Sequence, residues 1–347
     1  MNINKMSNKP QLSVIIPMYN SAGTINQCIS AIYNSSYKDY EVIVVDDAST
    51  DNSAEIVSKF PCKLIRLDKN LGPAYARNHG AKHAVGEILL FLDSDVVLEK
   101  SALEIAMNDL KMNKDSPAVV GIYSKTPANN TWFNWFMALQ KFSNWTMSQE
   151  EEYTAFQTRL GAIRKDIFTD LGGYNPIYRK ADTEDYEFGY RLTSKYGNVL
   201  LDKRIMGRHY FPSFPACVKR YFKRSFMWFR LFLKRRKFDN VTTTKSTGFF
   251  AISGLLSLIS FVLLLLFSKV YISVKYTSHI LGFAGVLFLA IFVVGNSHFY
   301  RLSAKEKGVL FMIYTILTSY LLAIIVTMGV IVSIFTYPLV KIAGIKK

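Results

Sequence analysis

The sequence is poor in several features that mark other classes of protein. Among 347 residues it has three cysteines, Cys28, Cys62 and Cys217, and their spacing matches neither a metal site nor a redox motif. It contains no glycine-rich dinucleotide turn and no Gly-x-x-x-x-Gly-Lys-Ser/Thr phosphate loop. Residues 1–11 are polar and lack the apolar run of a signal peptide. These absences exclude a disulfide-stapled protein and the two phosphate-loop folds, and they indicate a reducing, cytosolic setting for the first part of the chain.

Acidic side chains are scarce in the C-terminal part of the chain. Residues 1–202 hold 21 basic and 24 acidic side chains, whereas 203–245 hold 13 basic and one acidic, and 246–347 hold eight basic and one acidic. The formal net charge of +16 therefore arises downstream of residue 202. Because these basic residues directly precede long apolar runs, they favour anionic membrane lipids over nucleic acid as the partner.

Three long stretches without a charged residue follow the basic region, at 246–268, 276–300 and 308–340. A helix needs about 20 apolar residues to cross a bilayer, and these stretches have no polar face of the kind that a soluble helical core presents to water. We predict three transmembrane helices, at about 248–268, 278–300 and 308–336. Basic residues before the first and between the second and third fit the positive-inside tendency, so residues 1–245 are expected on the cytoplasmic side of the cell membrane.

Two segments have the composition of membrane-interface helices. Residues 217–237 interleave basic and aromatic side chains with helical spacing, as in a helix that lies in the headgroup layer. Residues 132–145 contain three of the four tryptophans, which suits either an interfacial acceptor platform or plain core packing. The expected organisation is a catalytic domain at 1–215, a basic amphipathic segment at 216–245 and a transmembrane region at 246–347.

The first 100 residues have the pattern of an α/β domain. Four short apolar runs alternate with helix-like segments, which predicts a parallel sheet covered on both faces, with strands at 12–16, 42–45, 64–67 and 88–92. The segment after the first run repeats apolar residues at helical spacing, at Ile25, Cys28, Ile29 and Ile32. Thr24 and Gln27 have the spacing of a capping box, and Pro73 is placed to begin a later helix.

Polar side chains follow each of these four runs. They are Tyr19 and Asn20, then Asp46 and Asp47, then Asp68 and Asn70, and finally Asp93 and Asp95. In open α/β sheets ligands bind beyond the carboxyl ends of the strands, so these groups should meet on one rim. Asp93 and Asp95 would repel each other unless a cation or donors neutralise them. Because the sequence has no phosphate loop to bind a diphosphate, we expect Mg²⁺ or Mn²⁺, held by Asp95 and Asp93, to bind the diphosphate instead.

Five segments occur in a fixed order along residues 11–212. They read Ser13-Val-Ile-Ile-Pro-Met-Tyr-Asn20, Val42-Ile-Val-Val-Asp-Asp-Ala-Ser-Thr-Asp51, Asn70-Leu-Gly-Pro-Ala-Tyr-Ala-Arg-Asn78, Phe91-Leu-Asp-Ser-Asp95 and Thr183-Glu-Asp-Tyr-Glu-Phe-Gly-Tyr-Arg191. Each is weak alone, but together they resemble family 2 glycosyltransferases. The resemblance implies the GT-A fold, a mostly parallel sheet covered by helices.

The same resemblance implies inverting transfer of a sugar from a nucleotide-diphosphate donor, with a UDP-sugar as the expected donor. It implies that Pro17 and Tyr19 line the nucleotide pocket, that Asp46 or Asp47 holds the base or ribose, and that Arg77 contacts the donor. It also implies that Asp93 and Asp95 form the Asp-x-Asp motif, which binds the metal and the ribose and diphosphate of the donor. Asp185 is the implied catalytic base. His209 stands where some GT-A enzymes place a metal-binding histidine, and a structural role is equally open.

The expected acceptor is associated with the membrane, as a polyprenyl phosphate or a glycolipid would be. The Gln/Arg-x-x-Arg-Trp motif of processive synthases is not matched by the nearest segment, Arg224-Ser-Phe-Met-Trp228, so single additions are expected. If the acceptor is a phosphate, already ionised at neutral pH, Asp185 need not remove a proton.

Two other functions could account for the acidic motifs and the apolar helices. A haloacid-dehalogenase-type phosphohydrolase would use Asp93 as a covalent nucleophile, but three strands precede the motif and no downstream Gly-Asp-x-x-x-Asp pattern occurs. A membrane scaffold without activity would have no need of the acidic pairs.

Overall fold

The computed structural model describes residues 9–147, 152–153, 155–177, 184–235, 245–267 and 275–342. The chain divides into two compact units. The first comprises Met1–Asn130 and Trp145–Phe211, and the second comprises Thr131–Asn144 and Pro212–Lys347. The tryptophan-rich segment at 132–145 is therefore divided: residues 132–144 belong to the second unit, and Trp145 belongs to the first.

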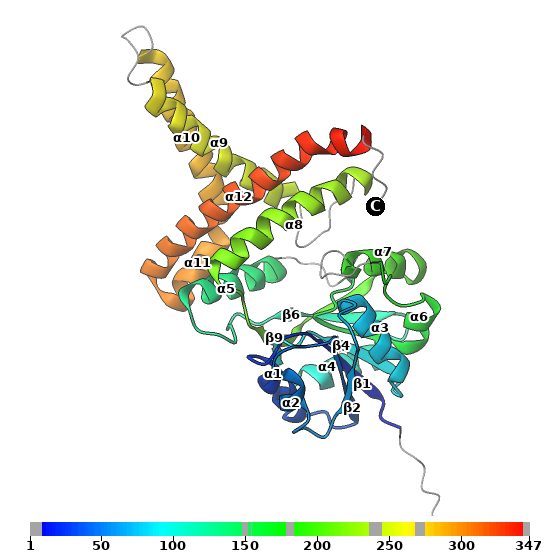
Figure 1. Ribbon diagram of the computed structural model, residues 1–347. Coiled ribbons are helices and arrows are strands. Elements are labelled where there is room, and N and C mark those ends of the chain that lie inside the picture. Colours follow the sequence, from blue (N-terminus) through cyan, green and yellow to red (C-terminus); the bar gives the residue numbers. More distant parts are fainter. Residues whose placement is uncertain are drawn as a thin grey trace, which may run out of the picture. The chain divides into compact units, whose positions relative to one another are not determined.

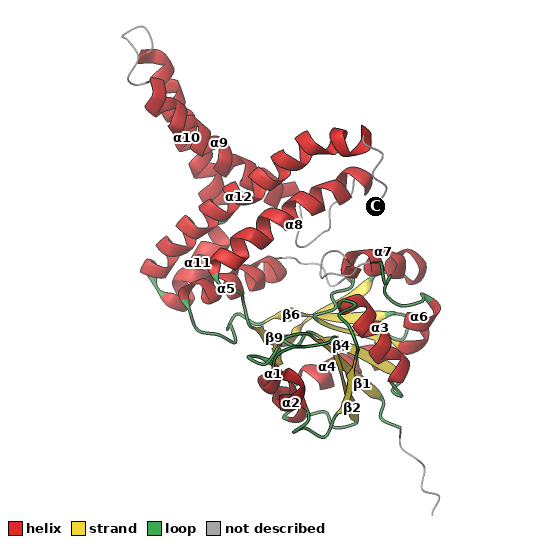
Figure 2. Cartoon of the chain, in the orientation of Figure 1, coloured by secondary structure: helices red, strands yellow, loops and turns green. Residues whose placement is uncertain are grey.

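The first unit is built on a single mixed sheet (Figures 1 and 2). Its strands in the described part of the chain are β1 (Leu12–Met18), β2 (Tyr40–Asp46), β3 (Lys63–Arg66), β4 (Ile88–Leu92), β5 (Val96–Leu98), β6 (Ala118–Tyr123), β7 (Glu152–Tyr153), β8 (Leu160–Arg164) and β9 (Val199–His209). They are ordered β3-β2-β1-β4-β8-β6-β9-β5, and β7 pairs with β9. The α/β class and the four predicted strands, β1 to β4, are confirmed.

Parallel pairing is confined to part of this sheet. β1 pairs in parallel with β2 and with β4, and β2 pairs in parallel with β3. Beyond β4 the directions are mixed: β8 runs antiparallel to both β4 and β6, β6 pairs in parallel with β9, and β5 runs antiparallel to β9. The sequence pattern predicted the parallel half and did not predict the antiparallel pairings.

Helices pack around this sheet. In the described residues of the first unit they are α1 (Ile25–Tyr33), α2 (Ser53–Val57), α3 (Pro73–His83), α4 (Ala102–Met112), α6 (Lys165–Asp170) and α7 (Glu184–Tyr196). The predicted apolar stripe of α1 is fully buried, and α3 begins at Pro73 as predicted. The predicted capping box is wrong. The Thr24 side chain makes no bond to the N–H groups of α1; its backbone, at φ −131° and ψ −33°, lies outside the extended conformation typical of an N-cap, and its hydroxyl donates to the Ser21 carbonyl at 3.3 Å.

The second unit is helical in the residues that the structure describes. It contains α5 (Trp132–Met147) up to Asn144, then α8 (Phe214–Arg235), α9 (Lys245–Phe267), α10 (Lys275–Gly295), α11 (Ser297–Lys307) and α12 (Val309–Ile342). Three of these are long and apolar enough to cross a membrane, at Gly248–Phe267, Thr277–Gly295 and Val309–Thr336. The second apolar helix ends at Gly295 and not at residue 300, because the Asn296 side chain bonds the Phe292 carbonyl at 2.8 Å and α11 begins anew. Residues 236–244 of the basic segment lie outside the described residues.

Small residues allow the long helices of this unit to approach closely. The Ser257 hydroxyl of α9 donates to the Gly285 carbonyl of α10 at 3.1 Å, and the Ser333 hydroxyl of α12 donates to the Phe226 carbonyl of α8 at 3.1 Å. A Cβ atom on Gly329 would lie 2.7 Å from the Phe222 carbonyl oxygen, so only glycine fits there. Small-residue contacts of this kind are typical of helices packed in lipid.

The aromatic residues of α5 pack against the beginning of α12. The Trp132 ring meets Phe311 and Tyr314 edge to face, at centroid distances of 5.6 and 5.4 Å, and remains 53% exposed. The ammonium of Lys307 lies 4.4 Å from the Trp135 ring centroid. An amphipathic aromatic surface beside an apolar helix is the arrangement expected at a membrane boundary.

We expect Gly80→Ala to destabilise the first unit. Gly80 lies in α3 where that helix crosses β1 and β2, and an added Cβ would lie 2.6 Å from Ile15 Cγ2 and 3.1 Å from Val45 Cγ2. Alanine in a helix is normally favoured over glycine by about 1 kcal/mol, whereas overpacking here should cost about 1–3 kcal/mol. The measurement is the thermal unfolding midpoint of the full chain in detergent. Gly23→Ala is the matched control, since no heavy atom of the described residues lies within 4 Å of its Cβ position; equal midpoints for the two variants would contradict the packing argument.

Candidate active site

Arg77 joins two elements that are far apart in the sequence. Its side chain extends from α3 and is 4% exposed. One terminal nitrogen, Nη2, lies 2.8 Å from Asp93 Oδ1 in the turn after β4, and the other, Nη1, lies 3.2 Å from Glu184 Oε1 at the first residue of α7. A buried guanidinium thus sits between two carboxylates. Three of the five sequence segments, those of Arg77, Asp93 and Glu184, are brought together by these bonds.

The electrostatics of this cluster favour a permanently charged arginine. Burial acts to lower the pKa of Arg77, but the Asp93 and Glu184 carboxylates outweigh it and raise the pKa above its usual value. The Tyr174 hydroxyl is buried beside the same groups, and burial first, then Asp185, Glu184 and Asp93, raise its pKa while Arg77 opposes the shift. No hydrogen-bond partner for that hydroxyl is found among the described residues.

Asp185 follows Glu184 in the first turn of α7. Its carboxylate is half-buried, and Oδ1 accepts the N–H of Tyr186 at 2.9 Å. The bond from Glu184 to Arg77 therefore fixes the helix end from which Asp185 projects. Asp185 and Asp93 both act to raise the pKa of Tyr174, after the larger effect of its burial.

Asp47 shapes the rim with its own carboxylate. Oδ1 accepts the N–H of Leu71 at 2.7 Å and Oδ2 accepts the N–H of Gly72 at 2.8 Å. Its backbone N–H donates to the Met18 carbonyl at 2.8 Å, directly after β1. One side chain therefore ties the loop after β2 to the loop before α3 and to the end of β1.

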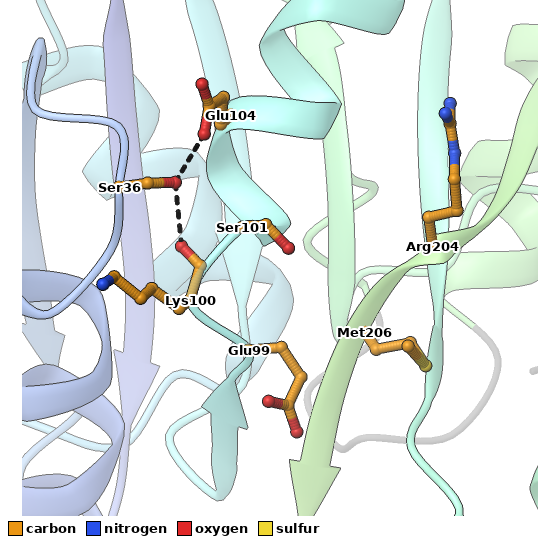
Figure 3. A pocket seen from close by; sticks show the side chains of 7 residues that line it. All are labelled: Ser36, Glu99, Lys100, Ser101, Glu104, Arg204 and Met206. Carbon is orange, nitrogen blue, oxygen red and sulfur yellow. Dashed lines mark hydrogen bonds between the residues drawn. The ribbon is translucent and has the colours of Figure 1, made fainter.

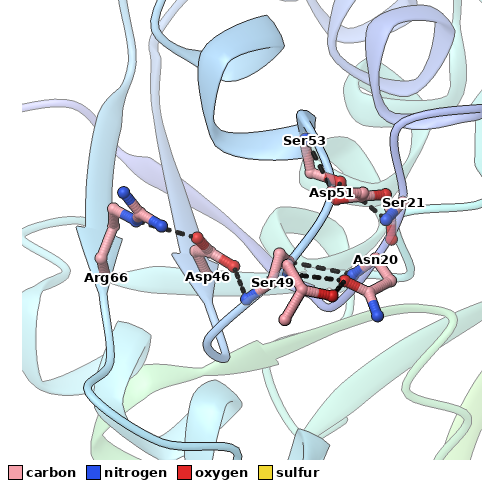
Figure 4. A network of polar contacts seen from close by, with 8 residues as sticks. Asn20, Ser21, Asp46, Ser49, Asp51, Ser53 and Arg66 are labelled. Atoms are coloured by element: carbon pink, nitrogen blue, oxygen red, sulfur yellow. Dashed lines mark hydrogen bonds and ion pairs between the residues drawn. The ribbon is translucent and has the colours of Figure 1, made fainter.

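Asp46 is directed away from solvent. It is the last residue of β2 and fully buried, and its oxygens accept from the N–H of Ser49 at 2.9 Å and from Arg66 Nε at 3.1 Å (Figure 4). Both oxygens are therefore engaged within the fold.

The loops after β1 and β2 are bonded to each other. The N–H groups of Asn20 and Ser21 donate to the hydroxyls of Ser49 and Ser53, at 2.9 and 2.8 Å (Figure 4). The Ser21 hydroxyl lies 2.8 Å from that of Ser94, between the two aspartates after β4. Asn20 and Ala48 have φ values of 49° and 62°, in the left-handed region that costs a non-glycine residue about 1–3 kcal/mol. Such strain is typical of loops that a site requires in one conformation.

Asp95 and His209 form the second polar pair of the rim. Asp95 Oδ2 lies 3.3 Å from His209 Nε2, and the Asp95 and His209 side chains are 42% and 11% exposed. His209 is the last residue of β9, and its ring contacts Tyr123 in a tilted arrangement and Phe211 edge to face, at centroid distances of 4.5 and 4.6 Å. Its other ring nitrogen, Nδ1, is buried and has no hydrogen-bond partner in the part of the chain that the structure describes.

Pro17 and Tyr19 stand at the end of β1, on the same edge. Pro17 is half-buried within the strand, and Tyr19, just past it, is 49% exposed. An exposed ring above a rigid strand end can receive a planar group by stacking.

A separate depression of about 460 Å³ lies elsewhere on the first unit (Figure 3). Its lining residues are Ser36, Glu99, Lys100, Ser101, Glu104, Arg204 and Met206. The Ser36 hydroxyl lies 2.6 Å from a Glu104 oxygen and 3.2 Å from the Lys100 carbonyl. None of the predicted site residues lines it, so this depression is distinct from the rim.

Sequence reasoning missed several polar groups of the rim. Tyr174 and Ser94 carried no signal of their own, and the Ser21 contact depends on the relative position of two loops. Glu184 was noted as a neighbour of Asp185, and its bond to Arg77 spans 107 residues, beyond any local pattern.

The chain belongs to glycosyl transferase family 2, whose sequence profile matches residues 13–186. The match includes the two loops joined by Asp47 and both carboxylates held by Arg77. The resemblance of the five segments is therefore confirmed, and the chain is a family 2 glycosyltransferase.

Relatives of known sequence agree with this assignment. An uncharacterized glycosyltransferase of Haemophilus influenzae is 40% identical over 111 residues, covering 30% of this chain and 44% of that protein. Glycosyltransferase GlyG of Streptococcus pneumoniae is 30% identical over 136 residues, covering 38% of this chain and 45% of that protein. The chain therefore spans less than half the length of these two curated relatives.

Solved structures agree on the fold. A mannosyltransferase from Pyrobaculum calidifontis, in complex with GDP-Man and Mn²⁺, has a TM-score of 0.52 and 17% identity, covering 91% of this chain and 86% of that one. The GT-A fold predicted from the sequence is confirmed. The phosphohydrolase alternative is replaced by the family assignment, and the scaffold alternative loses its support because the acidic residues of the pattern are retained and bonded in place.

We expect Arg77→Met to lower the free energy of unfolding by about 3–5 kcal/mol, because it leaves the Glu184 and Asp93 carboxylates without their cation. The measurement is the thermal unfolding midpoint of the full chain in detergent. Adding Glu184→Gln to the same variant should recover part of the loss. Lys59→Met, which removes an exposed helix pair with Glu55, is the control and should change stability by less than about 1 kcal/mol; a similar effect from both variants would refute the role assigned to Arg77.

Proposed function

We propose that this glycosyltransferase moves a sugar, with inversion, from a nucleotide-diphosphate donor to a membrane-associated acceptor, adding single units. A UDP-sugar is the proposed donor, and a polyprenyl phosphate or a glycolipid is the proposed acceptor. The strongest support is that Arg77 holds the turn of Asp93 and the helix end of Asp185 side by side on one rim.

For the donor, we propose that Tyr19 stacks on the nucleobase beside Pro17. Asp46 or Asp47 was predicted to hold the base or ribose, and the oxygens of both accept hydrogen bonds from the fold itself. Their proposed part is to fix the loops that line the nucleotide pocket. Arg77, with both terminal nitrogens on carboxylates, is proposed to act on the donor through Asp93.

The rim suits a divalent cation, Mn²⁺ or Mg²⁺. Asp95 Oδ2 and His209 Nε2 are 3.3 Å apart at a half-exposed edge, close enough to share one ion. The described residues contain no group of three or more His, Cys, Asp or Glu side chains that could bind a metal by themselves. Such ions commonly use one or two protein ligands and complete their shell with substrate phosphates. Asp93, bonded to Arg77, would hold the ribose or supply a further oxygen. When bound, the cation would neutralise charge on the leaving diphosphate.

Asp185 is the proposed catalytic base. A sugar hydroxyl is a poor nucleophile at neutral pH, and a carboxylate within hydrogen-bond reach can take its proton as the bond to the anomeric carbon forms. Glu184 is buried on Arg77, and the adjacent Asp185, at the same helix end, is half-exposed, which supports its proposed role toward an acceptor.

We propose that the second unit anchors the enzyme in the cell membrane, with the catalytic unit on the cytoplasmic side. Three of its helices are long and apolar enough to cross a bilayer. Helix α8 exposes Lys219, Arg220, Lys223 and Arg224 together with Phe222, which suits a surface of anionic lipids. The exposed Trp132 ring of α5 is proposed to lie at the same boundary and to receive the lipid part of the acceptor.

We expect Asp95→Ala to reduce sugar transfer by about 100-fold or more, since it removes a ligand of the ion that stabilises the leaving group. Transfer by the unmodified enzyme should stop with EDTA and return with Mn²⁺. Both are measured by product mass in a screen of nucleotide sugars on purified membranes. Glu55→Ala removes a carboxylate of α2 that is 71% exposed and should leave the rate unchanged; an Asp95→Ala enzyme as fast as this control would overturn the metal site.

We expect Asp185→Asn to separate the two classes of acceptor. With a glycolipid acceptor, kcat should fall by about 10²–10⁴-fold, because proton removal from the hydroxyl is lost. With a polyprenyl phosphate, already ionised, the rate should stay within about tenfold. The two rates are compared at saturating donor, with donor binding as the control for an intact rim. Full activity of the variant on a hydroxyl acceptor would remove Asp185 as the base.

A further inference from the structure

Arg159 lies beside the Asp-Ser-Asp turn without belonging to any of the five sequence segments. It directly precedes β8, whose first residue, Leu160, pairs with Leu92 at the end of β4. The Arg159 carbonyl accepts the N–H of Asp93 at 3.4 Å. The backbone therefore fixes this arginine next to the rim.

The guanidinium of Arg159 is held between aromatic rings. Its Cζ atom lies 4.5 Å from the Tyr123 ring centroid and 5.3 Å from the Trp145 ring centroid. Its Nη1 donates to the side-chain oxygen of Gln157, whose own amide nitrogen donates to the Tyr153 hydroxyl at 2.9 Å. Stacking and a single hydrogen bond thus set the orientation of a planar cation.

The other donors of this guanidinium have no acceptor. Its Nε and Nη2 atoms are closed off from solvent and have no hydrogen-bond partner in the part of the chain that the structure describes. The other inward-lying arginines of the unit differ. Arg191 binds a carboxylate and Arg164 binds the carbonyls of Leu110, Asn113 and Ser116. Arg77 leaves its Nε without a partner among the described residues, but both of its terminal nitrogens bind carboxylates, whereas Arg159 binds no carboxylate there. Buried charged donors without a partner are unfavourable, so this group is suited to a ligand that the protein does not supply.

The position of the Arg159 guanidinium limits the kind of ligand that it can bind. The Tyr123 ring on which Arg159 stacks is also 4.5 Å from the ring of His209, which pairs with Asp95. Nε and Nη2 together form the fork that matches two oxygens of a phosphate. Arg159 as a whole is partly exposed, so its side chain borders solvent while its Nε and Nη2 atoms are buried beside the rim.

We infer that Arg159 binds a phosphate group of a substrate at the transfer site, which rests on the proposed function. Two substrates carry such a group: the donor, through its diphosphate, and a lipid-phosphate acceptor. The shared chemistry is a phosphate oxyanion received by the Nε and Nη2 fork of a ring-stacked guanidinium.

The test is calorimetric titration of the full chain in detergent with Mn²⁺ present. In the donor arm the probes are UDP and GDP, each compared with its nucleoside. In the acceptor arm they are decaprenyl phosphate and decaprenol. We expect Arg159→Gln to weaken binding of the phosphorylated probe in one arm by about 10- to 100-fold, and to leave the probe without phosphate unchanged. The arm that changes identifies which substrate supplies the phosphate.

Two further variants keep the test decisive. Arg159→Lys retains the charge and loses the fork, so it should bind with intermediate affinity, and it serves in place of Arg159→Gln if that variant unfolds. Arg208→Gln removes a cation from the neighbouring strand end, where its partner is Glu99 at 3.8 Å, and should match the unmodified enzyme. Unchanged affinities for Arg159→Gln in both arms, with an unaltered unfolding midpoint, would overturn the inference alone. Failure of the unmodified enzyme to bind any nucleotide would overturn the proposed function as well.

Discussion

The buried guanidinium of Arg77 is the interaction on which the rest of the site depends. It is desolvated by α3 and the sheet, and it is stable there only because Asp93 and Glu184 provide opposite charge at 2.8 and 3.2 Å. The same two bonds fix the turn after β4 against the first residue of α7. The bonds that balance the buried charge of Arg77 are therefore the same bonds that align the proposed donor side of the site with the proposed acceptor side.

A second constraint acts on the loops of the rim. Asp47 uses both carboxylate oxygens on the N–H groups of Leu71 and Gly72, and Asn20 and Ala48 accept strained backbone angles in the loops on either side. A carboxylate that accepts hydrogen bonds from backbone N–H groups holds the loops in place. Tyr19 and the Asp95 side chain, which are proposed to meet the nucleobase and the metal, are 49% and 42% exposed.

Much of this architecture could be predicted because its causes are local. The buried stripe of α1, the start of α3 at Pro73 and the four parallel strands follow from periodicity and backbone preference. The prediction that Thr24 caps α1 was wrong because capping depends on the backbone conformation of Thr24, which lies outside the extended region typical of an N-cap, and residue spacing alone does not reveal it. The antiparallel pairings of the sheet were not predicted, since the pairing of β8 with β4, for example, depends on residues about 70 positions apart.

The sequence by itself determined the family, the α/β class, the acidic character of the rim and the three apolar helices, because each is written in composition, spacing or a short motif. Only the tertiary structure decided which charges are paired. It joined Arg77 to Glu184, set Asp95 beside His209 and left the stacked guanidinium of Arg159 with unused donors. The reason is physical: a side chain's charge is a property of its residue type, but its partner and its exposure to water are set by residues that the fold brings from elsewhere in the chain.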